Sequence, residues 1–197
     1  MTNWDLKKTF LISLIASLSI GALIAIFIFL FTDGFGEAEI KILLTTLAIG
    51  FFSLTGLCSS ALYERQKYKV VSVAGVITSL ASFVITTGII WEIIQWWNID
   101  EFPTKSWMIL IVLSISLAHS SLLLLVQSEQ KAVRISLIAT LIFIALTATT
   151  LILMILYRFG DIDIFYYRLL GVFAVLDVLG TIVTPILKKV YSVNQPQ

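Results

Sequence analysis

ISLIATLIFIALTATTLILMILY, the stretch Ile135–Tyr157, contains no charged residue, no glycine and no proline. The hydrocarbon core of a bilayer is about 30 Å thick, and a helix of about 20 residues, rising about 1.5 Å per residue, crosses it. Apolar residues surround this stretch on all sides, whereas a surface helix of a soluble protein keeps one polar face. The stretch therefore predicts a helix that crosses a membrane.

Five further segments meet the same test of length and apolar composition. We predict an all-α fold, a polytopic integral membrane protein in which residues 1–197 form a single transmembrane domain. The first span is expected to be retained, because its apolar stretch exceeds the about 7–15 residues of a signal peptide. The six predicted spans are Thr9–Phe31, Ile42–Tyr63, Val70–Trp91, Trp107–Val126, Ala132–Tyr157 and Phe165–Leu187.

The composition of the whole chain agrees with this class. Of its 197 residues, 59% are hydrophobic and 13% are charged, whereas soluble domains have about 45–50% and about 25%. This excludes a soluble globular domain and a disordered chain. A net charge of +1 gives no basic surface for nucleic acid. The single cysteine, Cys58, excludes a disulfide framework and a multi-cysteine metal site.

Lysine and arginine residues gather at one side of the predicted spans. Because such residues are retained on the cytoplasmic side, we expect both termini in the cytoplasm and a multi-pass location in the plasma (inner) membrane. The cytoplasmic group is Lys7, Lys8, Arg65, Lys67, Lys69, Lys131, Arg134, Lys188 and Lys189, and the outer group is Lys41, Lys105, Arg158 and Arg168.

Short motifs recur along the chain. Ile12–Ser17 (ISLIAS) in the first span resembles Ile135–Thr140 (ISLIAT) in the fifth, and Cys58–Ser60 resembles His119–Ser121. These matches favour three tandem helical hairpins, formed by spans 1–2, 3–4 and 5–6. Similar composition alone is the alternative explanation.

Small residues at intervals of four predict where the helices pack, because helices in lipid associate through close approach at such residues. One predicted stripe in the first span includes Ser13 and Gly21. A second stripe in the third span contains Ala74, Thr78, Ser82 and Thr86. The alternative is a polar pathway lined by hydroxyl groups.

Asp177 is the most informative residue of the sequence, because it lies near the middle of the sixth span. An aspartate at the bilayer centre costs about 2.5–3.5 kcal/mol on the insertion scale and normally faces protein or a water-filled cavity. Thr181 and Thr184 fall on the same helical face, and Pro185 frees a backbone carbonyl nearby. This face is the candidate functional surface, and a packing role for a protonated Asp177 is the alternative.

His119 is the only histidine, and we expect it at a depth similar to that of Asp177. Ser116 and Ser120 flank it on its helix. A His–Asp pair in a low dielectric can relay protons or hold a cation, because histidine titrates near neutral pH. The alternative is a neutral histidine that is hydrogen-bonded to a hydroxyl group. One histidine does not make a zinc site, which needs three or four ligands, so we expect no metal and no cofactor.

The candidate substrate or ion site therefore consists of Asp177, His119, Thr181, Thr184, Ser116 and Ser120, with no catalytic residues. We expect a protein without catalytic activity, a small channel- or transporter-like bundle. The alternative is a membrane-embedded accessory or assembly subunit of a larger complex, and a membrane enzyme acting on a lipid or quinone is the third possibility. The expected partners are the lipid bilayer and either further copies of the chain or a larger membrane complex, with no nucleic acid.

Overall fold

The computed structural model describes residues 6–31, 36–63, 68–93, 102–126, 130–157 and 163–193. These ranges are helical apart from their turns and contain no strand, which confirms the all-α prediction. The helices are α1 (Leu6–Phe31), α2 (Glu37–Ser60), α3 (Lys69–Ile90), α4 (Phe102–Leu124), α5 (Lys131–Leu156) and α6 (Ile164–Val193).

All six helices begin before the apolar segments that predicted them, and four of them, α2 to α5, also end earlier. α4 begins at Phe102 rather than Trp107, because Pro103 falls in the first turn, where its missing N–H costs nothing. α6 continues past Leu187 to Val193. Hydropathy locates the apolar part of a helix, whereas backbone hydrogen bonds continue into the charged ends.

Five of the helices, α2 to α6, are long and apolar enough to cross a membrane. In α1, Leu11–Phe27 forms a shorter apolar stretch. A helix satisfies its own backbone hydrogen bonds, as hydrocarbon requires. Length and composition therefore support a membrane protein.

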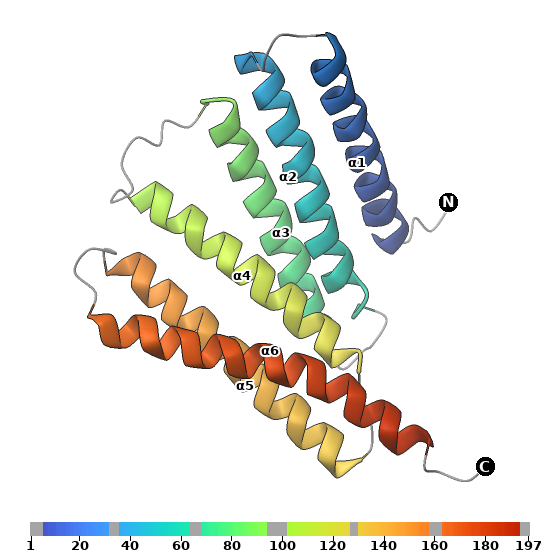
Figure 1. The fold of residues 1–197 in the computed structure, drawn as a ribbon, viewed down its shortest axis with the longest axis vertical. Coiled ribbons are helices and arrows are strands. Elements are labelled where there is room, and N and C mark those ends of the chain that lie inside the picture. The colour runs from blue at the N-terminus through green and yellow to red at the C-terminus, as the bar shows by residue number, and fades with distance from the viewer. Residues whose placement is uncertain are drawn as a thin grey trace.

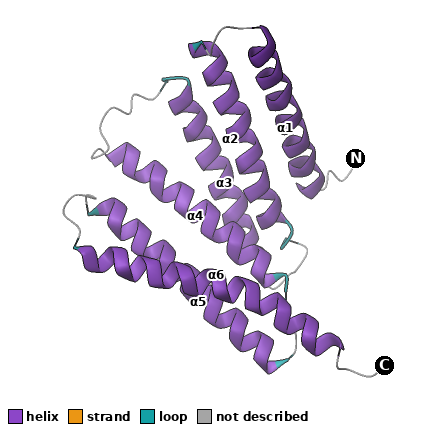
Figure 2. Cartoon of the chain, in the orientation of Figure 1, coloured by secondary structure: helices purple, strands orange, loops and turns teal. Residues whose placement is uncertain are grey.

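The six helices form an open layer in which each packs against the next along the chain, and α2 also packs against α4. Figure 1 shows α1, α2 and α3 running side by side, α4 crossing obliquely, and α5 and α6 lying together at the far end of the layer. Figure 2 shows the same succession of helices, with no strand in the described part of the chain. The expected hairpin partners do pack together, but α2 and α3 pack as well, so the hairpins are not separate units.

The layer does not close into a ring of helices. Among the described residues, the main contacts of α1 are with α2 and those of α6 are with α5. The two helices lie at opposite ends of the layer (Figure 1). The expectation of a bundle is therefore met only locally, where neighbouring helices pack against each other.

The interior of this layer is built from small polar side chains. Among the described residues, buried polar side chains outnumber buried apolar ones, and all of them are serine or threonine. Large apolar side chains such as Leu23, Val84 and Val175 are more than 65% exposed. This is the reverse of a soluble protein, and it suits helices that associate in lipid through small residues and hydroxyl groups.

The buried stripe of α3 differs from the predicted one. The buried positions are Ser72, Gly75, Ser79 and Ser82, whereas the sequence predicted Ala74, Thr78, Ser82 and Thr86. Strict steps of four residues advance by more than one turn of about 3.6 residues, so such a stripe drifts around the helix. Alternating steps of three and four stay on one face. The corresponding prediction for α1 is confirmed at Ser13, which accepts a hydrogen bond from Ser53 at 2.9 Å.

A hydrogen-bonded group of hydroxyls joins three helices at the centre of the layer. Ser79 of α3 donates to Thr55 of α2 at 3.0 Å and is hydrogen-bonded to Ser114 of α4 at 3.0 Å. All three side chains are buried. This group explains why α2, α3 and α4 pack together.

An ion pair joins the N-terminal end of α2 to the C-terminal end of α3. Nζ of Lys41 lies 3.0 Å from Oε1 of Glu92, and within α2 it lies 2.7 Å from Oε1 of Glu37. Glu92 has a positive φ of 55° just after α3, where the N–H groups of Glu92 and Ile93 bond back to Ile89 and Gly88. This Schellman ending stops α3 and leaves Glu92 beside Lys41.

Gly180 provides a test of this close packing. A Cβ atom at Gly180 would collide with the side chain of Thr140 on α5, whereas a Cβ at Gly171 on the same helix meets nothing within 4 Å. We expect Gly180→Ala to lower the free energy of unfolding in mixed micelles by about 1–3 kcal/mol. Gly171→Ala should leave it unchanged or raise it by up to about 1 kcal/mol. Equal effects of the two substitutions would contradict the packing of α5 against α6.

Candidate functional site

One face of α6 carries the polar residues that the sequence singled out. Asp177, Thr181 and Thr184 follow one another at helical spacing. Thr184 is fully buried, whereas Val175, Val178 and Ile182, on the other faces, are more than half exposed. The sequence pattern and the packing therefore agree on which face of α6 meets the neighbouring helices.

His119 of α4 contacts this face. Its Nε2 atom is hydrogen-bonded to Oγ1 of Thr181 at 2.9 Å, and its Nδ1 atom lies 3.9 Å from Oδ2 of Asp177. The structure thus brings together the only histidine and the only carboxyl group in the middle of a span, 58 residues apart in the sequence. The two side chains therefore lie beside each other, between α4 and α6.

The hydrogen bonds assign the proton of the imidazole ring. The hydroxyl group of Thr181 donates a hydrogen bond to the backbone carbonyl of Asp177 at 2.8 Å. Its oxygen therefore accepts a hydrogen bond from the Nε2–H group of His119. Nδ1 then has a lone pair facing the carboxyl group of Asp177. A second, longer contact of 3.5 Å joins Oγ1 of Thr181 to Oδ1 of Asp177.

The pair is neither fully enclosed nor bathed in solvent. The side chain of Asp177 is 14% exposed and that of His119 is 30% exposed. By contrast, the side chains of Thr55, Ser79 and Ser114 at the centre of the layer are buried. The imidazole and carboxyl groups therefore keep some exposed surface, as the Ser13 and Ser136 hydroxyls also do.

Pro185 adds a backbone oxygen to this region. Proline has no N–H, so the carbonyl of Thr181, four residues earlier in α6, loses its helical partner. The carboxyl group, the imidazole and the hydroxyl of Thr181 form a small cluster of polar atoms between α4 and α6, and this carbonyl lies one turn of α6 before Pro185. Such a cluster can hold a proton or a small cation.

Thr184 belongs to a different contact. Its hydroxyl is hydrogen-bonded to Ser136 of α5 at 2.9 Å and lies 3.5 Å from Oγ1 of Thr140. It also donates to the carbonyl of Gly180 at 2.7 Å. Because Thr184 is fully buried and bonds to Ser136, it packs α6 against α5 and lies outside the His119–Asp177 pair.

Ser116 and Ser120 are not drawn into the site by hydrogen bonds. In residues 102–126 and 163–193, no hydrogen bond links either serine to His119 or Asp177. Both are partly exposed positions on α4. Their positions on α4 suggested them. Ser120 is adjacent to His119 and points in another direction, whereas Ser116, three residues before His119, lies on the same side of α4 but makes no bond to it.

The sequence analysis did not assign Ser136 and Thr140 to this region. Both lie within the ISLIAT motif that suggested the repeat, and this motif was the available signal. Their role follows only from the packing of α5 against Thr184. Within the described part of the chain, no group of three or more histidine, cysteine or acidic residues could hold a metal ion.

Comparisons with protein-family models, with curated proteins and with solved structures found no match to this chain. Its function is therefore argued from the geometry of the site.

A double-mutant cycle tests the contact between α4 and α6. We expect His119→Ala and Thr181→Val to show a coupling energy of about 0.6 kcal/mol and at most about 1.7 kcal/mol, as hydrogen bonds between membrane helices do. The free energy of unfolding in mixed micelles provides the measurement. The control cycle pairs Ser120→Ala with Thr181→Val and should show no coupling beyond about 0.3–0.5 kcal/mol. If the two cycles give equal values, His119 does not bond to Thr181.

Proposed function

We propose that this protein is a multi-pass protein of the plasma membrane that binds and passes protons, or small cations in their place, at His119 and Asp177. The single observation that carries the proposal is the 3.9 Å approach of Nδ1 of His119 to Oδ2 of Asp177. Both groups are ionisable near the middle of helices that are otherwise apolar. Ionisable residues at such positions mark ion pathways and proton relays.

The helices do not require this pair in order to pack. Elsewhere in the layer, serine and threonine hydroxyls join neighbouring helices, as Ser13 and Ser53 do. The pair between α5 and α6, Ser136 and Thr184, is of the same kind. An aspartate costs about 2.5–3.5 kcal/mol at the bilayer centre, so a charged group where a hydroxyl would serve favours a functional role.

The geometry gives the pair one exchangeable proton. With Nε2 of His119 protonated towards Thr181, a further proton lies on Oδ2 of Asp177 or on Nδ1 of His119, and the pair is neutral overall in both cases. Loss of that proton leaves an aspartate anion in a low dielectric, which is unfavourable unless a cation replaces the proton. Proton and small cation are therefore expected to compete for the same site.

The arrangement of the helices is compatible with transport but does not enclose a central pore in one copy. The pair lies between α4 and α6, towards one end of the open layer. A passage along this helix pair, rather than through a ring of six helices, is the form of transport that suits the fold. We also propose that both termini are cytoplasmic, because nine of the thirteen lysine and arginine residues would lie on that side.

Asp177→Asn tests the proposed activity. The substitution keeps the shape of the side chain but removes its titrating group, so we expect loss of nearly all proton flux into liposomes driven by a potassium diffusion potential. A pH-sensitive dye inside the liposomes measures the flux. The matched control is Asp163→Asn, an exposed carboxyl group immediately before α6, which should retain the flux of the wild type.

Two outcomes would overturn the proposal. One is a wild-type protein that gives no more flux than empty liposomes under any proton or cation gradient. The other is an Asp177→Asn variant that keeps its flux. If Asp177→Asn fails to fold, His119→Gln provides the same comparison, because it removes the partner and keeps the carboxyl group.

Cysteine labelling tests the proposed topology. In a Cys58→Ala background, which has no other cysteine, we expect Gly36→Cys to react with a membrane-impermeant maleimide in intact cells. Thr2→Cys and Gln197→Cys should react only after the membrane is permeabilised. Labelling of the two terminal positions from opposite sides would require an odd number of spans.

The open layer favours a second candidate function, that of an accessory subunit in a larger membrane complex. α1 and α6 each have a neighbouring helix mainly on one side, and their remaining surface is apolar. In that case Asp177→Asn would change the mass of the native assembly, measured in nanodiscs, and there would be no proton flux to lose. The mass and flux measurements together separate the two candidates.

A further inference from the structure

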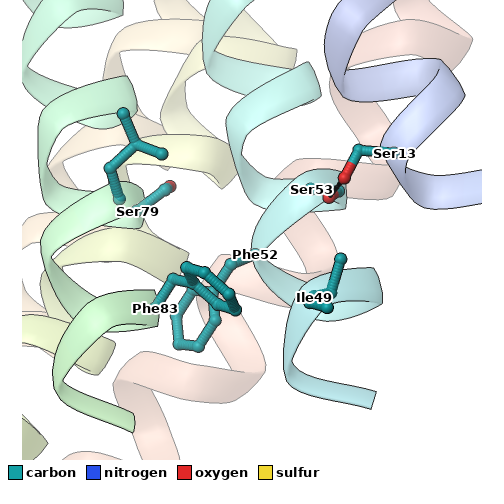
Figure 3. Close-up of a pocket in the computed structure, with 7 residues that line it drawn as sticks. Ser13, Ile49, Phe52, Ser53, Ser79 and Phe83 are labelled. Atoms are coloured by element: carbon teal, nitrogen blue, oxygen red, sulfur yellow. Dashed lines mark hydrogen bonds between the residues drawn. The ribbon is translucent and has the colours of Figure 1, made fainter. Parts of the chain in front are cut away.

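A hollow lies among α1, α2 and α3, away from the contact between α4 and α6. Its volume is about 190 Å³, and it is partly open on one side. Figure 3 shows Ser13 on α1, Phe52 and Ser53 on α2, and Ser79 and Phe83 on α3 around it. Ile49 and Leu80 complete its lining.

The wall of the hollow is mostly apolar, and its serine hydroxyls are hydrogen-bonded to other hydroxyl groups. The rings of Phe52 and Phe83 meet edge to face with centroids 6.2 Å apart. The hydroxyls of Ser13 and Ser53 are hydrogen-bonded to each other, and Ser79 is hydrogen-bonded to Thr55 and Ser114. The lining of the hollow is therefore mostly hydrocarbon and contains no charged side chain. Its hydroxyl groups already have hydrogen-bond partners within the protein, so a ligand need not be polar.

The hollow also lies far from the charged ends of its helices. Ile49 and Phe52 are near the middle of α2, and Ser79 and Phe83 are near the middle of α3. With about 1.5 Å per residue, these positions are at least about 10 Å from either end of their helices. If the helices cross the membrane, the open side of the hollow meets hydrocarbon.

We propose that this hollow is a binding site for the acyl chain of a membrane lipid. The inference rests on the membrane embedding proposed above and not on proton movement at His119. One turn of a partner helix, about 10 Å across and about 5.4 Å long, occupies roughly 400 Å³ and does not fit. An apolar chain does fit, since a dry cavity of about 150 Å³ lined by similar residues holds benzene.

A photoreactive lipid tests the proposal. The protein is placed in nanodiscs that contain a phospholipid with a diazirine in the middle of one acyl chain, illuminated, and analysed by peptide mass spectrometry. We expect residues 49–53 and 80–83 to carry several-fold more adduct than the exposed apolar residues 172–182 of α6. The excess should persist when unbound lipid is removed with detergent before illumination.

Ile49→Trp fills the hollow, so we expect it to remove this excess. The matched control is Leu47→Trp on the same helix, where the side chain is 64% exposed and the substitution should change nothing. Phe83→Ala widens the hollow and should increase the adduct, which keeps the test decisive if Ile49→Trp does not fold. Equal labelling of the hollow and α6, or an excess that survives Ile49→Trp, would overturn the proposal.

Discussion

The whole structure depends on one constraint, that hydrocarbon offers no hydrogen-bond partner to any polar group. Helices satisfy the backbone, and the side chains must then satisfy one another. In this chain serine and threonine do so across helix contacts, as Thr55, Ser79 and Ser114 do at the centre of the layer. The interior is therefore polar and small, and the large apolar side chains face outward.

The same constraint makes an ionisable pair such as His119 and Asp177 costly within the apolar helices. Hydroxyl pairs such as Ser136 and Thr184 hold α5 and α6 together without a charge, so a carboxyl group is not needed for packing. The pair differs from these contacts because its side chains are ionisable. One layer of helices thus carries hydroxyl contacts between neighbouring helices and one contact between an imidazole and a carboxyl group.

The two ends of the layer are correspondingly different. Around α1, α2 and α3, the hydroxyls that line the hollow are hydrogen-bonded to other hydroxyls, and the rest of its wall is hydrocarbon. Between α4 and α6, a histidine and a carboxyl group lie 3.9 Å apart, beside the hydroxyl of Thr181. We infer that the first region interacts with lipid and the second with protons or cations.

The sequence by itself determined the helical class and the apolar segments, because hydropathy adds up along a short stretch and needs no knowledge of neighbours. It also identified His119 and Asp177, since ionisable residues stand out against an apolar background. Only the tertiary structure decided that the layer stays open, that the buried stripe of α3 runs through Ser72 and Ser79, and that Thr184 packs against Ser136. Such outcomes depend on which faces of which helices meet, and in lipid that choice is made by small differences in close packing between helices of similar composition.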